Sequence, residues 1–348
     1  MHILPSLAQG GAEKFTLDLC SELAEDSSVE LLTFYAGGKF DALFNDKFKI
    51  IKNDFSSFRR VFLPFYLYFK FITGKYNIVH MHLMTIFFCF PIIFFVRNVK
   101  YIYTFHGDPC YDYWLVRKSI FILSKFNLVR FVAVSSDVLN LVTTEYPGIN
   151  VSLIENGAVS PIVNEKVVDK LRCEYEGKMV FVNVARAHKI KNQIELVKAF
   201  SELPAHVHLL IVGSVDEGDY SIELMRLIEE TGNVTHLGFR KDVGNILTIA
   251  DFSIISSHHE GLPMSLIESL SLGVPVLTTP IFNLKAMVLN NSIGYVFNGY
   301  IAGDFKRKIL ELVMPNFNSS MKSNARKLYF DFYDISICKE KYELVYND

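Results

Sequence analysis

The feature that most constrains the fold is a regular alternation along the chain. Short runs of β-branched and aromatic residues recur, and segments with the apolar spacing of helices separate them. In the expected helix Ala12–Ala24, for example, Phe15, Leu19, Cys20 and Leu23 form one apolar stripe. Strands that alternate with helices build parallel sheets with helices on both faces. The chain is therefore predicted to belong to the α/β class.

The predicted strands fall into two series of about six each. The first series is expected at His2–Leu4, Val29–Tyr35, Ile78–His82, Tyr101–Phe105, Phe131–Val134 and Val151–Ile154. The second series is expected at Met179–Val184, Val207–Val212, Val234–Leu237, Phe252–Ile255, Val274–Thr278 and Tyr295–Phe297. At 348 residues the chain is long enough for two cores. Two series therefore indicate two Rossmann-like domains.

The strand pattern lapses over Val159–Asp169, which places the domain boundary there. We expect an N-terminal domain of residues 1–160 and a C-terminal domain of residues 161–324. A helical segment at about 325–348 is expected to pack back on the first domain. Ligands of open α/β sheets bind outside the carboxyl ends of the strands, so the cleft between the domains is the expected site.

The charge distribution is uneven. The formal net charge of −2 argues against a nucleic-acid-binding protein, because phosphate neutralisation needs a strongly basic surface. From Arg59 to Arg130, however, ten lysines and arginines stand against two aspartates, among the apolar runs Val61–Phe71 and Leu83–Val96. Basic and aromatic residues together suit the surface of an anionic membrane. Alternatively, the aromatic residues are core and the cations a solvated rim.

Other features point to a cytoplasmic protein. The longer apolar run has 14 residues and contains Pro91, so it is too short to span a bilayer. The N-terminus lacks the pattern of a signal peptide. The cysteines number five, are scattered and show no CxxC spacing, which indicates reduced thiols and no zinc site.

The stretch Glu260–Pro280, EGLPMSLIESLSLGVPVLTTP, carries the clearest chemical signal. Pro263 suits the first position of a helix that Gly273 ends. The amides of residues 264–266 would then be free to bind an anion such as phosphate. Glu260 precedes this helix and Glu268 lies within it, where a carboxylate can accept hydrogen bonds from hydroxyls. A phosphate beside hydroxyls describes a sugar nucleotide.

This stretch resembles the Glu-x7-Glu signature of retaining glycosyltransferases of the group-1 (GT4) family, which have the GT-B fold. The resemblance covers nearly the whole chain. Further motifs match it in order: GGAEK (10–14), VHMH (79–82), TFHGD (104–108), VARAHKIKNQIELVKAF (184–200) and LGFRKDV (237–243). The resemblance implies two Rossmann-like domains that face each other across a cleft.

The resemblance also implies roles for four charged residues. Arg186 and Lys191 would hold the donor diphosphate and stabilise the charge that builds on it as the glycosyl bond breaks. Glu268 would bind the ribose hydroxyls and Glu260 the donor sugar. The simpler alternatives are a solvated loop for the two cations, and for Glu268 a carboxylate that favours the helix dipole.

Further positions follow from the resemblance. His106 would lie beside the donor sugar as a catalytic residue, Gly10 and Gly11 would approach the donor, and Phe239 and Arg240 would flank the base. For these the alternatives are a structural histidine, an ordinary Gly-Gly turn and a core phenylalanine. The remaining donor-binding positions are Gly261, Leu262, Pro263, Met264, Ser265 and Leu266.

We therefore predict a metal-independent retaining glycosyltransferase without a cofactor. It would transfer a hexose-type sugar from a UDP- or GDP-linked donor to a surface-polysaccharide or lipid-linked glycan acceptor, for polysaccharide, capsule or lipopolysaccharide synthesis. It would be cytoplasmic, with possible peripheral contact to the inner face of the plasma membrane. Two alternatives remain: a non-catalytic nucleotide-sugar-binding subunit, and a metal-dependent hydrolase that uses His80, His82 and His106.

Overall fold

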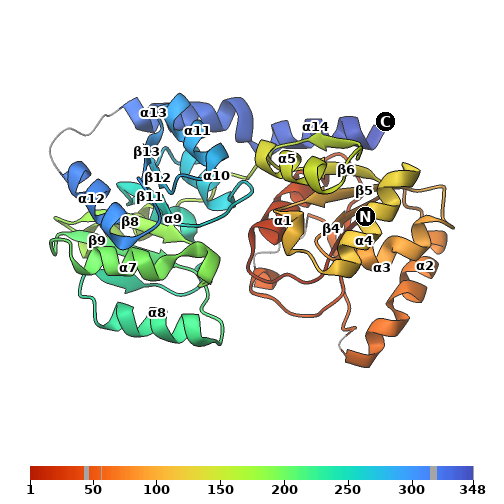
Figure 1. Ribbon diagram of the computed structural model, residues 1–348, viewed down its shortest axis with the longest axis horizontal. Helices are drawn as coiled ribbons and strands as arrows, with labels where there is room; N and C mark the ends of the chain where they lie inside the picture. The colour runs from red at the N-terminus through yellow and green to blue at the C-terminus, as the bar shows by residue number, and fades with distance from the viewer. Residues whose placement is uncertain (43–46, 56, 314–319, 348) are drawn as a thin grey trace. The chain divides into compact units, whose positions relative to one another are not determined.

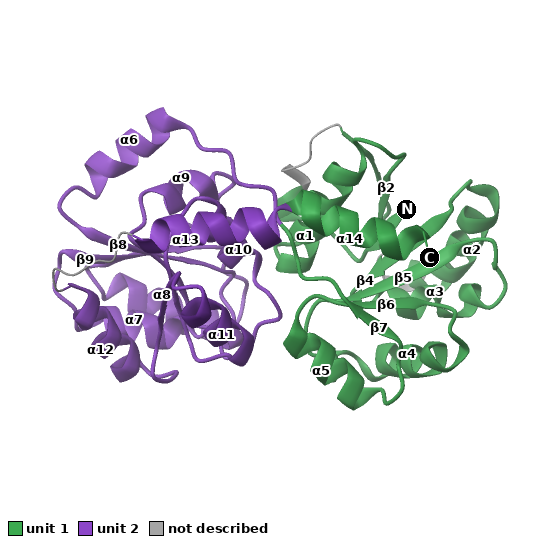
Figure 2. Ribbon diagram, turned by 90° about the horizontal axis from the view of Figure 1, so that it is seen from above, with its two compact units in different colours: residues 1–157, 335–348 green, residues 158–334 purple. Residues whose placement is uncertain are grey.

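The computed structural model describes residues 1–42, 47–55, 57–313 and 320–347. The chain divides into two compact units (Figures 1 and 2). Unit 1 comprises Met1–Gly157 and Ile335–Asp348, and unit 2 comprises Ala158–Asp334. Each unit contains one wholly parallel sheet with helices on both faces, so the predicted pair of Rossmann-like α/β domains is confirmed. The expected segment 325–348 is divided, because residues 325–334 belong to unit 2.

Unit 1 has a seven-stranded sheet of order β3-β2-β1-β4-β5-β6-β7. Its strands are β1 (His2–Leu4), β2 (Glu30–Thr33), β3 (Lys49–Lys52), β4 (Ile78–His82), β5 (Lys100–Phe105), β6 (Arg130–Ala133) and β7 (Val151–Leu153). Its helices are α1 (Gly11–Leu23), α2 (Leu63–Thr73), α3 (Thr85–Ile93), α4 (Trp114–Phe126), α5 (Ser136–Glu145) and α14 (Ile335–Asn347). Short 3₁₀ turns cover Lys39–Ala42, Ser57–Phe62 and Pro109–Tyr111.

All six strands predicted for unit 1 are present, with ends shifted by at most two residues, and β3 was missed. This edge strand, KIIK, has only two apolar residues and both are partly exposed. The apolar run that identifies a buried strand is therefore too short here.

The alternation of side chains along β4 gives the sheet of unit 1 two different faces. Val79 and Met81 join the large apolar core under α2, α3, α4 and α5. His80 and His82 point to the opposite face, since successive side chains of a strand alternate. There α1 and α14 lie side by side, and Tyr342 of α14 packs against His80 (Figure 2).

Unit 2 has a six-stranded sheet of order β10-β9-β8-β11-β12-β13. Its strands are β8 (Met179–Val184), β9 (Val207–Val212), β10 (Val234–His236), β11 (Phe252–Ile255), β12 (Val276–Thr278) and β13 (Gly294–Val296), which confirms the second predicted series. Its helices are α6 (Glu165–Glu174), α7 (Gln193–Ser201), α8 (Asp219–Glu229), α9 (Val243–Thr248), α10 (Met264–Ser271), α11 (Phe282–Asn290), α12 (Ala302–Val313) and α13 (Ser320–Leu328). A 3₁₀ turn at Lys189–Lys191 and a π-helical turn at Tyr329–Tyr333 complete the unit.

Two apolar clusters bury the faces of this second sheet. Residues of α7, α8 and α12 pack on one face, and residues of α6 and α9 pack on the other. The turns that follow β8 and β11 remain at the carboxyl edge of the sheet, and they carry Arg186, Lys191 and Glu260.

Candidate active site

The predicted site residues are divided between the two units. Gly10, Gly11 and His106 belong to unit 1, and all the others belong to unit 2. The two groups are therefore described separately.

The turn after β8 carries both predicted phosphate-binding cations. Arg186 lies two residues after the end of the strand, and Lys191 closes the 3₁₀ turn that leads into α7. The amide side chain of Gln193 donates to the Arg186 carbonyl (2.9 Å), which closes the loop between the two cations. The Arg186 guanidinium is half exposed, and its Nη1 lies 4.0 Å from an Asp216 carboxylate oxygen. An anion can therefore reach the guanidinium from solvent.

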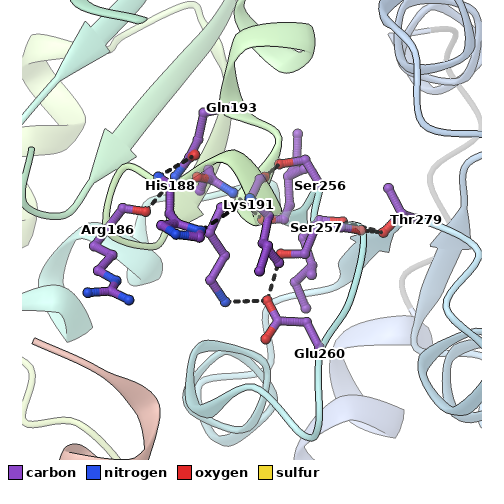
Figure 3. A network of polar contacts seen from close by, with 12 residues as sticks. Arg186, His188, Lys191, Gln193, Ser256, Ser257, Glu260 and Thr279 are labelled. Carbon is purple, nitrogen blue, oxygen red and sulfur yellow. Dashed lines mark hydrogen bonds and ion pairs between the residues drawn. The ribbon is translucent and has the colours of Figure 1, made fainter. Parts of the chain in front are cut away.

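Lys191 is fixed by the loop that follows β11. Its ammonium donates to Glu260 Oε1 at 2.5 Å, as Figure 3 shows. The Ser257 hydroxyl donates to the same oxygen at 2.6 Å, and the Ser256 hydroxyl donates to the Lys191 carbonyl at 2.6 Å. Ser257 is itself held, because Thr279 Oγ1 donates to its carbonyl at 2.6 Å. The ammonium retains two further N–H donors for a ligand.

The two cations also act on His188, which lies between them on the same turn. Burial is the largest cause that lowers the pKa of His188 below its usual value, and the positive charges of Arg186 and Lys191 add to the effect. His188 Nδ1 accepts a hydrogen bond from the Ile190 amide (3.2 Å), so it also shapes the turn. The turn therefore places two cations at the carboxyl end of β8, close to the carboxylates of Asp216 and Glu260.

The start of α10 lies four residues after Glu260 and differs from the prediction in two respects. Pro263 is the residue before the helix and not its first residue. The Leu266 amide, predicted to be free, donates to the Pro263 carbonyl at 3.1 Å, because the first turn of the helix closes tightly. Of the three amides predicted to bind an anion, those of Met264 and Ser265 are therefore the two that this bond does not involve. Gly273 ends the helix in a left-handed conformation (φ 72°), as predicted.

The rest of the Glu-x7-Glu segment is rigidly placed. Glu268 is buried within α10, as are Gly261 and Leu262 before the helix. The Gly261 carbonyl accepts a hydrogen bond from Asn283 Nδ2 at 2.6 Å. A loop held in this way can present its groups to a ligand without reordering.

The predicted base-binding residues lie on the loop after β10. Arg240 makes two hydrogen bonds of 2.7 Å to the carboxylate of Asp242, one from Nε and one from Nη2. Phe239 and Arg240 are both partly exposed. The guanidinium is therefore oriented by Asp242.

In unit 1, Gly10 precedes α1 and Gly11 is its first residue. Gly10 has an extended backbone, and a side chain there would meet only the flexible end of Glu13. His106 directly follows β5, and its ring is packed by Phe15 of α1. Its Nε2 lies 2.9 Å from His82 Nδ1, and desolvation lowers its pKa to about 3. The ring is therefore neutral at pH 7.

The histidine cluster differs from the one that the hydrolase alternative requires. Among the residues that the structure describes, the group whose ligand atoms lie within 4.8 Å of one another is His2, His80 and His82, without His106. His80 already bonds Tyr346 and Thr104, each at 2.8 Å. The rings thus form hydrogen bonds to protein groups. Asp108, two residues after His106, caps a turn by accepting from the Cys110 amide.

Several residues that build the site were not predicted. Ser257 holds Glu260, Thr279 holds Ser257, Asn283 holds the following loop, and His188 shapes the cationic turn. Gly213 was missed as well: a side chain there would lie 2.0 Å from the Ala185 carbonyl, so the glycine lets the turn after β9 approach the turn after β8. The adjacent serines in SSHHEG could have indicated a polar loop, whereas the other contacts join segments far apart in the sequence.

Comparison with known families accounts for most of the chain. A family model described as "Glycosyltransferase Family 4" matches residues 9–159, and one described as "Glycosyl transferases group 1" matches residues 170–328.

Among curated proteins, N-acetyl-alpha-D-glucosaminyl L-malate synthase of Bacillus anthracis is 22% identical over 64% of this chain and 62% of its own length. The putative glycosyltransferase EpsD of Bacillus subtilis is 25% identical over 57% of this chain and 53% of its own length. A UDP-Gal:alpha-D-GlcNAc-diphosphoundecaprenol alpha-1,3-galactosyltransferase of Escherichia coli is 22% identical over 57% of this chain and 54% of its own length. The chain thus spans between about half and two thirds of these relatives.

Solved structures share the whole fold. HepE of Anabaena in complex with UDP-glucose superposes with a TM-score of 0.85 at 18% identity, covering 99% of this chain and 98% of that one. WaaG, a glycosyltransferase involved in lipopolysaccharide biosynthesis, superposes with a TM-score of 0.71 at 15% identity, covering 99% and 98%. At these identities the likeness establishes the fold.

Proposed function

This chain belongs to the group-1 (GT4) family of glycosyltransferases, and we propose that it transfers a hexose-type sugar from a nucleoside diphosphate sugar to a lipid-linked or surface-polysaccharide glycan with retention of configuration. The observation that carries the proposal is the polar network of unit 2. Lys191 and Ser257 both donate to one carboxylate oxygen of Glu260, four residues before α10, and Arg186 lies on the same turn as Lys191 (Figure 3).

In the proposed reaction the bond between the anomeric carbon and the diphosphate breaks. The acceptor oxygen bonds the same face of the sugar, and its proton passes to the departing diphosphate. Negative charge therefore grows on the diphosphate in the transition state, where Arg186, Lys191 and the first amides of α10 stabilise it. These groups supply the positive charge themselves, so the transfer proceeds without a divalent metal or a cofactor.

The remaining site residues bind the donor. Glu260 accepts from a hydroxyl of the transferred sugar through the oxygen that Lys191 leaves free, and Glu268 binds the ribose. Backbone groups near Phe239 and Arg240 hold the base. The solved relative HepE binds UDP-glucose and the E. coli relative is named for UDP-Gal, which supports a UDP-linked donor here.

A donor panel tests this function. The purified chain is incubated with UDP- and GDP-linked hexoses and N-acetylhexosamines, with and without EDTA, and an undecaprenyl-diphosphate glycan as acceptor. We expect nucleoside diphosphate release with one donor class, unchanged by EDTA, and a product that retains the anomeric configuration. Inversion or dependence on a metal would contradict the mechanism. Tight binding of a nucleotide sugar without turnover would favour the non-catalytic subunit.

We also propose that α2, α3 and α4 of unit 1 dock on the anionic inner face of the plasma membrane. Helix α2 buries only the stripe Leu63, Leu67 and Phe71. A surface helix normally turns polar residues outward, but here Phe65 and Phe69 are 65% and 60% exposed. Large exposed apolar patches mark interaction surfaces.

The exposed apolar surface continues over the neighbouring helices and carries positive charge. Helix α3 contacts both α2 and α4, so the three helices form one layer, seen on unit 1 in Figure 2. Trp114 of α4 is 67% exposed, with the Lys118 ammonium 6.0 Å from its ring centre. We define this membrane-docking surface by its exposed aromatic residues Phe62, Phe65, Phe69, Phe95, Trp114, Phe121 and Phe126, and its exposed cations Arg59, Arg60, Arg97, Lys118 and Lys125. No helix in the described ranges has the length and hydropathy to cross a bilayer.

Vesicle binding tests this surface. We expect wild-type protein to sediment with phosphatidylglycerol vesicles and less with phosphatidylcholine vesicles. The double variant Phe65→Ser/Phe69→Ser should bind at least about tenfold more weakly, because each ring inserted in the interface contributes on the order of 1 kcal/mol or more. Phe330→Ser in unit 2, where the side chain is 64% exposed, is the matched control and should bind as wild type. Equal binding by both variants, or no binding by wild type, would refute membrane docking.

A further inference from the structure

A chain of three histidine rings runs from the edge of the unit 1 sheet into its interior. His106 Nε2 lies 2.9 Å from His82 Nδ1, and His82 Nε2 lies 3.2 Å from His2 Nδ1. His106 is partly exposed, whereas His82 and His2 are buried. A ligand therefore has access to the chain only at its His106 end.

The fold itself creates this alignment. The register of β1 against β4 pairs His2 with His80, and His82 lies two residues further along β4 on the same face. The register of β4 against β5 pairs His82 with Thr104, two residues before His106. Three rings from three segments thus meet on the face that α1 and α14 cover.

Burial keeps each of the three rings neutral at pH 7. Desolvation lowers the pKa of His2 and His82 well below the usual value and that of His106 to about 3. A neutral imidazole has one donor and one acceptor nitrogen. The three rings can therefore donate in only one direction at a time, and the tautomer of His106 is coupled to those of the other two rings.

We propose that His82 and His2 are positioning residues that hold His106 as its Nε2–H tautomer, so that Nδ1 accepts a hydrogen bond from a donor-sugar hydroxyl. In this state His106 Nε2–H donates to His82 Nδ1, and His82 Nε2–H donates to His2 Nδ1. All three rings then have the proton on Nε2, the tautomer that a neutral histidine side chain favours in water. The reverse direction would put all three protons on Nδ1. The inference rests on the proposed function only for the identity of the hydroxyl.

Nitrogen-15 NMR of histidine-labelled protein tests the tautomer without any substrate. We expect His106 Nε2 to show the shift of a protonated nitrogen and Nδ1 that of an unprotonated one. In His82→Phe both nitrogens should move toward intermediate values, because the ring loses its acceptor. A protonated Nδ1 in the wild type, or stoichiometric zinc in the purified protein, would overturn the proposal. Because the NMR experiment contains no substrate, it can refute this proposal without testing the glycosyltransferase assignment.

Steady-state kinetics test whether the tautomer of His106 affects turnover. His82→Phe should lower kcat about tenfold or more, with a smaller change in the KM for the donor. His82→Asn keeps an acceptor near the position of Nδ1 and should restore part of the loss. His208→Phe in unit 2 is the control: this ring is also buried and also hydrogen-bonded to a threonine, Thr235, at 2.9 Å, but it lies outside the chain of rings, so kcat should stay near wild type.

A double-variant cycle tests whether the loss of kcat in His82→Phe arises through His106. If His82 acts through His106, His82→Phe should cause no further loss of kcat in the His106→Ala background. An equal loss in both backgrounds would show a general structural effect and overturn the positioning role.

Discussion

Replacing Lys191 with alanine is expected to lower kcat about 10²- to 10³-fold, the usual cost of removing one group that stabilises charge in a transition state. The Lys191 ammonium is held by Glu260 at 2.5 Å and keeps two N–H donors for the diphosphate. Its charge interacts most strongly when the leaving group carries its full charge, so kcat should fall more than donor affinity. Release of the nucleoside diphosphate measures kcat, and calorimetric titration with the nucleoside diphosphate measures binding.

Lys189→Ala is the matched control for this variant. Lys189 lies on the same 3₁₀ turn, but its side chain is exposed and it is not part of the network around Glu260. It should retain wild-type turnover. Equal turnover in Lys191→Ala and wild type would mean that the diphosphate binds elsewhere, and the proposed site would be abandoned.

Replacing Glu260 with alanine should have the second largest effect, a loss of kcat of about 10²-fold. The substitution removes the proposed acceptor for a sugar hydroxyl. It also releases the Lys191 ammonium and leaves the Ser257 hydroxyl without the oxygen to which it donates. The carboxylate thus contributes both a ligand contact and the placement of a cation. Steady-state kinetics with the donor identified by the panel should show the loss chiefly in kcat.

Two further variants separate those contributions. Glu260→Gln keeps an oxygen that can accept from Lys191 and Ser257 but removes the charge, and it should fall between wild type and Glu260→Ala. Ser257→Ala removes one hydrogen bond and leaves the ion pair, so its loss should be only a fewfold, the value of about 1 kcal/mol for one such bond. A Ser257→Ala enzyme as slow as Glu260→Ala would show that the loop, and not the carboxylate, is what matters.

The sequence alone was sufficient to predict the α/β class, the two domains and twelve of the strands. Those features depend on local apolar periodicity, and a run such as VHLLIV at 207–212 fits few structures other than a buried strand. It also indicated Arg186, Lys191, Glu260 and Glu268, because ordered motifs preserve the kinds of residue that the chemistry needs. Local pattern failed at β3, whose apolar run is too short, and at the Leu266 amide, whose bond depends on how tightly the first turn of α10 closes.

Tertiary structure alone decided which of these residues interact. Lys191 and Glu260 are 69 positions apart and meet because β8 and β11 are neighbours in the sheet. His2, His82 and His106 form one chain of rings because β1, β4 and β5 lie side by side in register. Strand order and register result from packing over the whole domain, and local spacing does not encode them. The sequence therefore indicated candidate chemical groups, and only the folded sheets determined the partner of each group.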